Sequence, residues 1–369
     1  FSGGTPSSSN KDFYGGNIAF IRSGELHADS TELFITQAGF DSSSAKMVEV
    51  GDLLLAMYGA TSGDIAVSKI KGAINQAILC IRTKQNKKFI ESVWNKHVSK
   101  NLRKYLQGGQ GNLSADIVKG ISFFFPTLKE QEKIANLVSL LDERIATQNK
   151  IIGKLQSLIK GMEDNLLDNP LWEKTYLRSF MQFFPTNSLS WEQLSYKEGA
   201  IRNLHYGLIH GFLTRGINSA SLPMIKNEAV PKQYISCQVG DVAFADASED
   251  TGEIAKSVEF VDTIEGNTIC GLHTIHGRDI KNRTVVGFKG FAFNSRYFHN
   301  QIKRLAQGTK VFSITANNLS SCYVYLPDLE KQKAIVKLLR SYEEQLIIGR
   351  MILKQYEKQK QYLLRQLFI

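Results

Sequence analysis

Two stretches of the sequence, about 200 residues apart, constrain the fold more than any other feature. PTLKEQEKIANLVSLLDERI begins at Pro126, and PDLEKQKAIVKLLRSYEEQL begins at Pro327. Each has a leucine two residues and a glutamine five residues after its proline, and each continues into apolar residues spaced alternately by four and three. This pattern, sustained over about five heptads, predicts a long helix with a coiled-coil seam.

The two predicted helices cover residues 128–167 and 328–369. Thr127 and Glu130 make a capping-box pattern for the first helix, and Asp328 is the expected N-cap of the second. The predicted helix–helix seam consists of apolar and aromatic residues: Ile134, Val138, Leu141, Ile145, Ile152, Leu155, Ile335, Leu339, Tyr342, Leu346, Leu353 and Tyr356. The simplest partner for each helix is the other one, in an antiparallel coiled coil; helices of another protein are the alternative.

The segments outside the helices are repeated as well. GDLLLAMYGATSGDIA, from Gly51, aligns without gaps on GDVAFADASEDTGEIA, from Gly240, and LSADIVKGISFFFP parallels ITANNLSSCYVYLP. Short β-rich runs bounded by Gly, Asn, Asp and Ser predict strands and turns. We therefore expect an α+β protein with two similar mixed α/β domains separated by two long helices. The predicted boundaries are domain 1 at 1–127, helix 1 at 128–167, a connector at 168–190, domain 2 at 191–327 and helix 2 at 328–369.

Charge and cysteine usage limit the partners and the compartment. The net charge of +10 favours nucleic acid or an anionic membrane surface as a partner, although a solvated basic surface is the alternative. No run of 18 apolar residues is present, so no membrane-spanning segment is expected, and no membrane is among the predicted partners. Four scattered cysteines without C-x-x-C spacing predict reduced, buried thiols in a cytoplasmic protein, with no zinc site and no disulfide framework. Because FSGGTPSSSN reads like the middle of a domain, we also expect N-terminal residues to be missing.

Motifs of catalysis are absent from the sequence. Asp168-Asn169-Pro170-Leu171-Trp172 is similar to the N-P-P-aromatic loop of amino-methyltransferases, but it lacks the second proline and follows a predicted helix. No Walker A motif, no strand–G-x-G–helix cofactor site, no H-E-x-x-H frame and no E-x-K tripeptide occur. No catalytic residues and no metal ligands are therefore predicted.

Loops at matched positions in the two domains carry the residue types that contact DNA. Cations bind phosphates, while amides, hydroxyls, aromatics and arginines read base edges. In domain 1 the candidates are Arg22, Ser23, Lys46, Tyr58, Thr61, Ser62, Asn75, Gln76, Gln107, Gln110 and Asn112. In domain 2 they are Arg202, Asn203, His205, Tyr206, Lys226, Asp246, Ser248, Glu249, Lys256, His273, Arg278 and Lys310.

These features together resemble the specificity (S) subunit of type I restriction–modification systems. The resemblance is carried by SGGTPSSSNKDFYGGNIAFIRSGEL, GDLLLAMYGATSG, INQAI, LQGGQGNLS and PTLKEQEKI in the first half. AIRNLHYG, GDVAFADASEDTG and PDLEKQKAI carry it in the second half. It covers nearly the whole chain, although the first repeat lacks the stretch that precedes the second repeat around residues 191–198.

The resemblance implies a non-catalytic subunit with two target-recognition domains, each of which reads one half of a split, asymmetric DNA site. It implies that the two helices set the distance between the half-sites and dock two methyltransferase subunits, through which restriction/translocase subunits join. S-adenosylmethionine, ATP and magnesium would then bind to those partners, and this chain would bind no cofactor.

Two other functions remain open at this point. The chain could be the recognition region of a fused restriction–methylation enzyme, which methyltransferase activity without partners would reveal. It could also be a scaffold whose coiled coil binds only protein, in which case it would show no salt-dependent binding to DNA.

Overall fold

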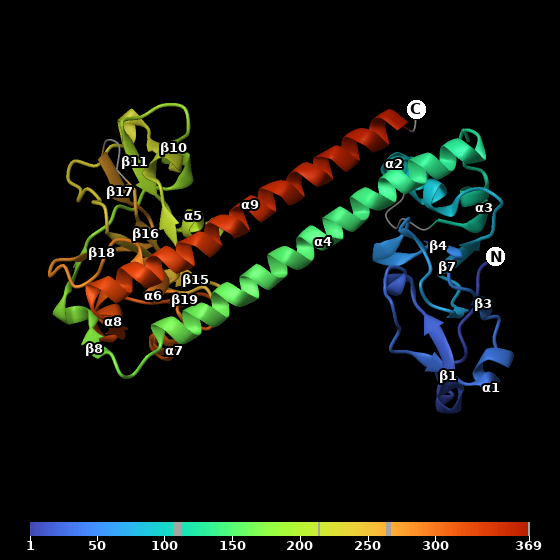
Figure 1. Cartoon of the computed structure of the whole chain (residues 1–369), viewed down its shortest axis with the longest axis horizontal. Coiled ribbons are helices and arrows are strands. Elements are labelled where there is room, and N and C mark those ends of the chain that lie inside the picture. Colours follow the sequence, from blue (N-terminus) through green and yellow to red (C-terminus); the bar gives the residue numbers. More distant parts are fainter. Residues whose placement is uncertain (106–112, 213–214, 263–266, 368–369) are drawn as a thin grey trace. The chain divides into compact units, whose positions relative to one another are not determined.

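The computed structural model describes residues 1–105, 113–212, 215–262 and 267–367, with side chains omitted for 98–105 (Figure 1). The chain forms two compact units, each with its own core. Unit 1 comprises Phe1–Asn149 and Ile352–Ile369, and unit 2 comprises Lys150–Met351. Both long helices therefore contribute to both units.

Unit 1 contains two small sheets. The first has the strand order β2-β1-β6-β3, and the second has the order β5-β4-β7. The strands are β1 (Tyr14–Ile21), β2 (Phe34–Ile35), β3 (Lys46–Val48), β4 (Leu53–Ala56), β5 (Ile65–Val67), β6 (Gly72–Ile74) and β7 (Ile78–Ile81). The helices are α1 (Gln37–Asp41), α2 (Lys87–Tyr105) and α3 (Ala115–Lys119), with 3-10 turns at Lys11–Phe13, Ser23–Glu25 and Gly59–Thr61.

Unit 2 contains a five-stranded sheet, β12-β16-β14-β18-β9, and a four-stranded sheet, β10-β13-β11-β17. The first uses β9 (Met181–Phe184), β12 (Gly216–Ile217), β14 (Val242–Ala245), β16 (Ser257–Phe260) and β18 (Thr274–Asp279). The second uses β10 (Leu194–Ser195), β11 (Ile201–Leu204), β13 (Met224–Ile225) and β17 (Asn267–Cys270). Two further pairs join β15 (Ala247–Ser248) to β19 (Phe312–Ser313) and β8 (Glu173–Tyr176) to β20 (Tyr323–Leu326).

The shorter helices of unit 2 contribute to two of its hydrophobic clusters. They are α5 (Tyr206–Gly211), α6 (Phe288–Ala292), α7 (Arg296–Leu305) and α8 (Ala316–Ser321), with 3-10 turns at Leu177–Ser179, Trp191–Gln193, Ser219–Ser221 and Asn227–Ala229. Buried Phe244, Phe291 and Phe298 lie in one cluster with residues of the long helices. The globular part of unit 2 and the long helices therefore share one core.

The repeated Gly-Asp pair has the same structural role in both units. Gly51 and Gly240 adopt left-handed backbone angles, with φ near +90°, which a residue with a Cβ adopts only at a cost. The following Asp52 accepts a hydrogen bond from the Glu49 backbone and pairs with Arg82 at 3.1 Å. Asp241 accepts from the Gln238 backbone and pairs with Arg278 at 2.7 Å. The motif therefore fixes the turn into the central strand.

The segment 168–190, expected to be a connector, is also part of the sheets of unit 2. β8 pairs with β20, and β9 pairs with β18, with His276 opposite Phe184. Such short strands have weak sequence signals because their partners are far along the chain. In unit 1, residues 121–126, which correspond to β20, have no regular structure, and Phe124 is 94% exposed.

The long helices α4 (Leu128–Leu167) and α9 (Leu329–Leu367) begin as the sequence predicts. Thr127 and Glu130 form the reciprocal bonds of a capping box, and Asp328 accepts from the Lys331 backbone at 2.8 Å. The caps on both helices are thus confirmed, because these side chains satisfy N–H groups that the helix leaves unpaired.

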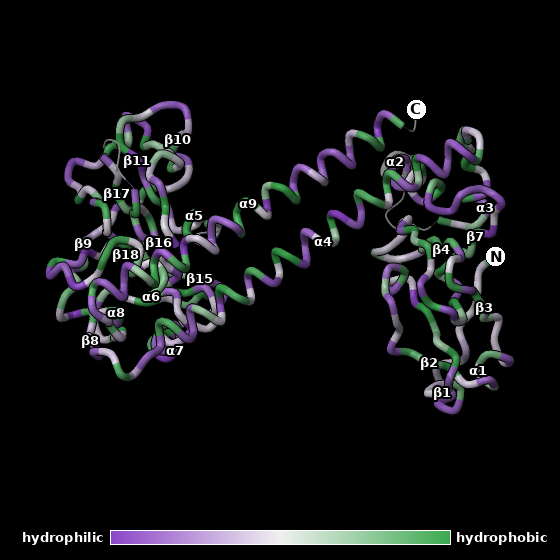
Figure 2. The backbone as a smooth tube through the Cα atoms, in the orientation of Figure 1, coloured by the Kyte–Doolittle hydropathy of each residue, from purple (hydrophilic) through white to green (hydrophobic). Residues whose placement is uncertain are grey.

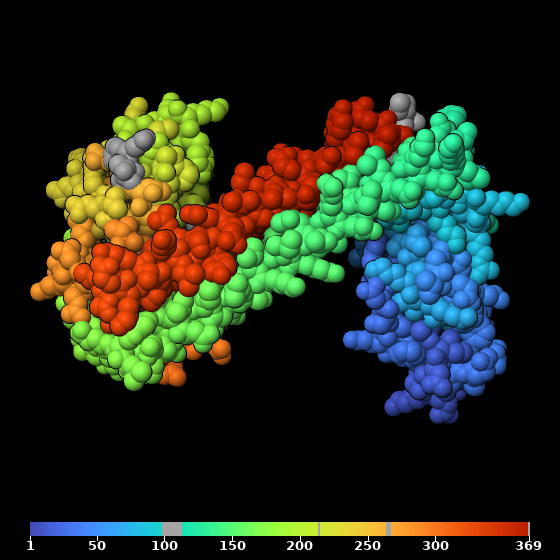
Figure 3. All heavy atoms as spheres, viewed as in Figure 1, coloured from blue at the N-terminus to red at the C-terminus, as the bar shows by residue number. Residues whose placement is uncertain are grey.

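The two helices pack antiparallel. In unit 1 the first half of α4 meets the end of α9, where Asp142 pairs with Lys360 at 2.5 Å. In unit 2 the end of α4, including Leu167, packs with the start of α9, including Leu339. Apolar positions recur along both helices in Figure 2, and Figure 3 shows the atoms of α9 (red) against those of α4 (green). Together with the two mixed α/β parts, this pairing confirms the predicted fold class.

The residues of the predicted seam differ in their degree of burial. Val138, Leu141, Ile152, Ile335, Leu339 and Leu346 are buried. Ile134, Ile145, Leu155, Tyr342, Leu353 and Tyr356 are half-buried. No helix among the described residues is long and apolar enough to cross a membrane.

Candidate nucleic-acid interface

One corner of unit 2 gathers four of the predicted DNA-binding residues. It lies where β11 and β14 end and β18 begins, and we call it the reading corner: His205, Tyr206, Asp246 and His273. His205 is the N-cap of α5, and its Nδ1 accepts a hydrogen bond from the Gly207 backbone at 3.2 Å. Side chains at strand ends and helix starts project from a rigid frame, as a binding site requires.

Aromatic rings and one carboxylate connect the residues of the reading corner. His205 lies between the rings of Trp191 and Tyr206, at centroid distances of 4.4 and 4.8 Å. Tyr206 meets His273 edge to face at 5.3 Å, and His273 Nδ1 is 3.1 Å from Asp246 Oδ1. His205 is buried, whereas the side chain of His273 is 50% exposed and that of Asp246 is 31% exposed and half-buried.

Backbone strain and electrostatics both mark this corner as unusual. His273 has a left-handed φ of 54°, a conformation that costs free energy and is enriched at functional sites. Burial, followed by the neighbouring His273, lowers the pKa of His205. Burial raises the pKa of Asp246, while His273 acts in the opposite direction. The imidazole of His205 is therefore held neutral, which suits its role as an acceptor for the Gly207 backbone.

The corresponding corner of unit 1 has the same frame and different side chains. Parallel pairing of Ile21 with Ile74 in unit 1 matches the pairing of Leu204 with Cys270 in unit 2. The residues next to the equivalent strand ends form three matched pairs. Arg22 and His205 follow β1 and β11, and Met57 and Asp246 follow β4 and β14. Ala77 and His273 directly precede β7 and β18. Arg22 is exposed and pairs with Glu25 at 2.7 Å. Met57 is buried, so Arg22 is the polar side chain that the corner of unit 1 presents, and the two corners differ in chemistry on equivalent scaffolds.

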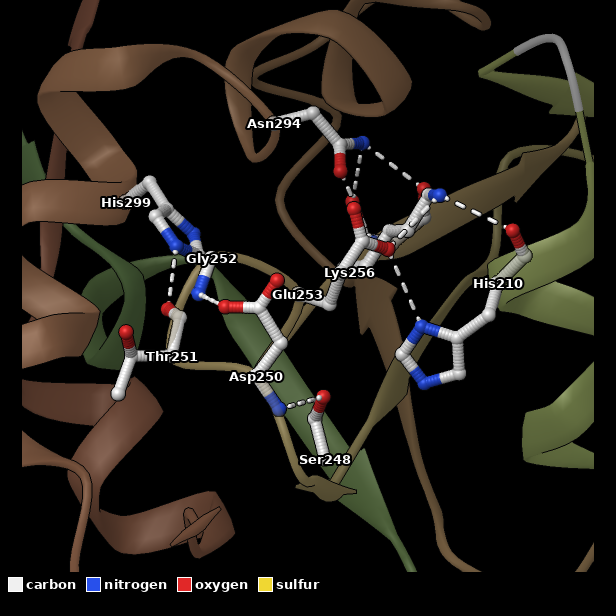
Figure 4. Close-up of polar contacts among 10 residues, drawn as sticks. His210, Ser248, Asp250, Thr251, Gly252, Glu253, Lys256, Asn294 and His299 are labelled. Atoms are coloured by element: carbon white, nitrogen blue, oxygen red, sulfur yellow. Dashed lines mark hydrogen bonds and ion pairs between the residues drawn. The ribbon is translucent and has the colours of Figure 1, made fainter. Parts of the chain in front are cut away.

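A second feature of unit 2 is a charged cleft of about 720 Å³ between the turn 250–256, α7 and the long helices. Figure 4 shows this turn, in which Asp250 accepts from the Gly252 backbone and Glu253 contacts both His210 and Lys256. His299 on α7 contacts the Thr251 carbonyl at 3.0 Å. These contacts fix the turn as one wall of the cleft.

Cations outnumber acids in the lining of the charged cleft. The cations are Lys160, Arg215, Lys256, Arg296, Lys303 and Arg350, and the acids are Glu163, Asp164, Glu253 and Glu343. Within the described part of the chain, Lys160, Arg296, Lys303 and Arg350 form no ion pair. A lining with this balance favours an anionic ligand such as a phosphate group.

The structure places several predicted DNA-binding residues away from a free surface. Asn203 is fully buried and accepts a hydrogen bond from Asn187 at 2.8 Å. Arg202 donates to the carbonyls of Ala220 and Leu222, and Arg278 is held by Asp241. Arg202 and Arg278 support the fold in this conformation, because their guanidinium groups already have protein partners. Asn203 is too deeply buried to contact DNA here, although its Nδ2 has no hydrogen-bond partner in the part of the chain that the structure describes.

The remaining predicted residues are distributed over both units. Lys46, Tyr58, Gln76, Glu249 and Lys310 are exposed, and Ser23, Thr61, Ser62, Asn75, Lys226, Ser248 and Lys256 are half-buried. Gln107, Gln110 and Asn112 lie outside the described residues. Of the six cations in the cleft, sequence reasoning selected only Lys256, and it did not select Trp191. A Trp has no DNA-specific signal by itself, and the six cations come from five separate segments.

Comparison with known proteins decides the family. The model described as "Type I restriction modification DNA specificity domain" matches residues 1–157 and 222–358. The chain belongs to this family. The resemblance read from the repeated motifs is thus confirmed. Specificity subunits are non-catalytic DNA-recognition components, so the family places the chain among recognition proteins rather than enzymes.

Curated relatives come from Methanocaldococcus jannaschii. The chain is 26% identical over 337 residues to the type I restriction enzyme MjaVIII specificity subunit, covering 85% of this chain and 77% of that protein. It is 26% identical over 390 residues to the putative MjaX specificity subunit, covering 97% and 87%.

Solved structures share the fold. An S subunit from M. genitalium matches with a TM-score of 0.61 at 13% identity, covering 100% of this chain and 93% of that one. A chain from a structure of the type I R-M system matches with a TM-score of 0.56 at 15% identity, covering 95% and 91%.

Proposed function

We propose that the chain reads a bipartite, asymmetric DNA target, with one half-site for each unit. The observation that supports this most is the pair of matched corners. The framework residues Gly51, Asp52 and Arg82 have counterparts in Gly240, Asp241 and Arg278. The side chains at the corners differ, however. Two units with the same backbone scaffold and different side chains at the corner would recognise different DNA sequences, because base edges are recognised by specific hydrogen-bond donors and acceptors.

The charged cleft supports the affinity of unit 2 for DNA in this proposal. Its unpaired cations would contact phosphates, and the reading corner would contact bases. Each unit alone would bind weakly and with strong salt dependence, while the covalent link would make the second contact intramolecular.

We further propose that the long helices dock two methyltransferase subunits, and that restriction/translocase subunits join through them. Support comes from apolar side chains that stay exposed at matching positions of the two helices. Leu137 and Leu338 are each 41% exposed, and Ile151 and Ile352 are 44% and 38% exposed. A surface that occurs twice fits two copies of one partner, and exposed apolar residues mark such surfaces.

In this proposal the cofactors belong to the partners. S-adenosylmethionine, ATP and magnesium would bind to the methyltransferase and restriction subunits, and the complex would act on DNA in the cytoplasm. The four free, buried cysteines suit a reducing compartment. Methyltransferase activity of the isolated chain would instead favour a fused enzyme's recognition region. Absence of salt-dependent DNA binding would favour a protein-binding scaffold.

The reading corner provides the test. His273→Ala, expressed with the partner subunits, should weaken discrimination by roughly 10- to 100-fold at one base pair of one half-site, since a good base contact contributes about 1–3 kcal/mol. Sequencing that maps methylated bases in host DNA measures this. His27→Ala is a matched control, because His27 pairs with Asp64 at 2.9 Å on the surface of unit 1.

The proposal requires that His273→Ala and His27→Ala never alter the same half-site. Changes in both half-sites from one variant, or an unchanged motif in His273→Ala, would contradict the assignment of one half-site to each unit.

A further inference from the structure

Three potential metal ligands meet in the interior of unit 2. Cys237, Cys270 and His276 are 5%, 3% and 1% exposed, and their ligand atoms lie within 4.8 Å of one another. The Sγ atoms of the two cysteines are 3.6 Å apart. Cys237 and Cys270 are 33 residues apart, and Cys270 and His276 are 6 residues apart. A search for C-x-x-C motifs therefore does not find this group, because the fold assembles it from three segments.

Rigid elements hold each of the three residues. Cys270 ends β17, and His276 lies inside β18. The Cys237 backbone donates to the Thr268 carbonyl at 2.7 Å, which ties its loop to β17. A site held in this way needs little reorganisation to bind an ion.

A second layer of polar groups surrounds the histidine. His276 Nε2 is 2.7 Å from Asp241 Oδ2, and Arg278 Nε and Nη2 donate to Asp241 at 2.8 and 2.7 Å. A carboxylate that orients a ligating imidazole is the usual arrangement around zinc in proteins.

Distances and charges suit a thiophilic cation. Two thiolates on a tetrahedral zinc ion, with Zn–S bonds of about 2.3 Å, lie about 3.8 Å apart, close to the 3.6 Å between these Sγ atoms. Two thiolates neutralise a divalent ion, while Asp241 and Arg278 neutralise each other. A buried site without net charge avoids a large desolvation cost.

We propose that Cys237, Cys270 and His276 bind a thiophilic metal ion of the Zn²⁺ class, with Asp241 completing or orienting the ligand set. Binding releases the two thiol protons and forms two metal–sulfur bonds and one metal–nitrogen bond. Cys270 pairs with Leu204, directly before His205, and is three residues from His273. The bound ion would therefore stabilise the backbone next to His205 and His273 in the reading corner. The competing roles for the two thiols are those of small apolar core residues and of a disulfide pair.

Cobalt(II) is the probe that distinguishes these roles. The full-length chain, purified with chelator under reducing conditions, should bind one equivalent of Co²⁺. Binding should produce a near-ultraviolet thiolate-to-cobalt charge-transfer band that Zn²⁺ then abolishes. Zn²⁺ at a hundredfold excess over its Kd should raise the Tm of unit 2 by roughly 5–10 °C.

Cys237→Ser and Cys270→Ser should each lose the charge-transfer band. Cys322→Ser is the matched control, because Cys322 is also buried in unit 2 but lies in a different core cluster. If the serine variants fail to fold, alkylation of the unmodified chain replaces them. Zn²⁺ should then protect Cys237 and Cys270, but not Cys322, from a thiol reagent in partial denaturant.

The proposal is overturned if Co²⁺ binds without the charge-transfer band, if binding stays well below one equivalent, or if Zn²⁺ protects all cysteines equally. None of these measurements uses DNA, so their failure leaves the proposed DNA recognition untouched.

Discussion

At the scale of single residues, the buried glutamines at the helix starts are the best example of how the repeat determines structure. Gln131 is 1% exposed, donates to the Pro126 carbonyl at 2.9 Å and accepts from the Asn86 backbone. Gln332 is fully buried and repeats this, donating to the Pro327 carbonyl and accepting from the Val285 backbone. One amide thus links each recognition domain to the start of its long helix.

Gln332→Ala should lower the free energy of unfolding of unit 2 by about 2–4 kcal/mol. The substitution leaves the half-buried Val285 N–H, the Arg283 carbonyl and the buried Pro327 carbonyl without this partner, and each such hydrogen bond contributes about 0.5–1.5 kcal/mol net. Urea unfolding followed by circular dichroism measures the change. Lys333→Ala, next along the helix and 61% exposed, should stay within about 0.5 kcal/mol. Equal effects of the two variants would contradict this role for Gln332.

From the sequence, Gln332 is recognisable only as a residue that recurs at the same position in both repeats, and its hydrogen bonds are not predictable. Its hydrogen-bond partners Arg283 and Val285 are 49 and 47 residues away, so no local pattern predicts them. The reading corner has the same limitation. His205, Asp246 and His273 were all candidates from the sequence, but only the pairing of three strand ends brings them together. That pairing also removes Asn203 from the surface.

At the scale of secondary-structure elements, the pairing of α4 and α9 in unit 2 encloses two acidic side chains. Glu163 and Glu343 both contact Arg215, at 3.6 Å from its Nε and 3.1 Å from its backbone N respectively. Burial raises the pKa of Glu343 to about 7, and neighbouring Glu163 adds to the rise. Burial also raises the pKa of Glu163, against the opposing effect of Arg215. The helix interface therefore contains two carboxyl groups, Glu163 and Glu343, whose raised pKa values favour the protonated form.

The stability of unit 2 should therefore fall as pH rises from about 4.5 to 7. The folded state holds the Glu343 proton up to a pKa of about 7, whereas the unfolded state releases it near 4.5. Above that window, Glu343→Gln should be more stable than the unsubstituted chain by about 1–3 kcal/mol. Below pH 4.5 the two should be equal, since both side chains are neutral there and Gln can still accept from the Arg215 backbone.

Urea unfolding at pH 4.5, 6 and 8 measures this difference. Glu344→Gln is the control, because Glu344 is adjacent but exposed and should show no such pH-dependent gain. A constant difference between Glu343→Gln and the unsubstituted chain at all three pH values would contradict a raised pKa for Glu343.

The helices themselves were predictable, and the small strands were not. Heptads and caps gave 128–167 and 328–369, against the observed Leu128–Leu167 and Leu329–Leu367. A sustained period is a local signal, whereas β8 and β9 exist only because β20 and β18 provide edges for pairing. The segment 168–190, expected to be a connector, therefore contains β8 and β9, which its local sequence does not predict.

At the scale of the whole molecule, each helix is divided between the two units. The division falls between residues 149 and 150 in α4 and between 351 and 352 in α9. Each unit therefore contains a recognition domain with one segment from each helix. Such an arrangement allows the length of the helix pair to change while each unit keeps all of its own contacts.

Seven residues inserted after Asn149 and seven more after Met351 should lengthen the spacer between half-sites by about three base pairs. One heptad in each helix preserves the seam and adds about 10.5 Å at 1.5 Å per residue, and duplex DNA rises about 3.4 Å per base pair. Mapping methylated motifs in cells that express the partner subunits measures the spacer, and both half-site sequences should stay unchanged. Insertion into α4 alone is the control, because it shifts the seam against α9 and should abolish bipartite recognition. If the double insertion leaves the spacer unchanged, the helices do not set the distance between the half-sites.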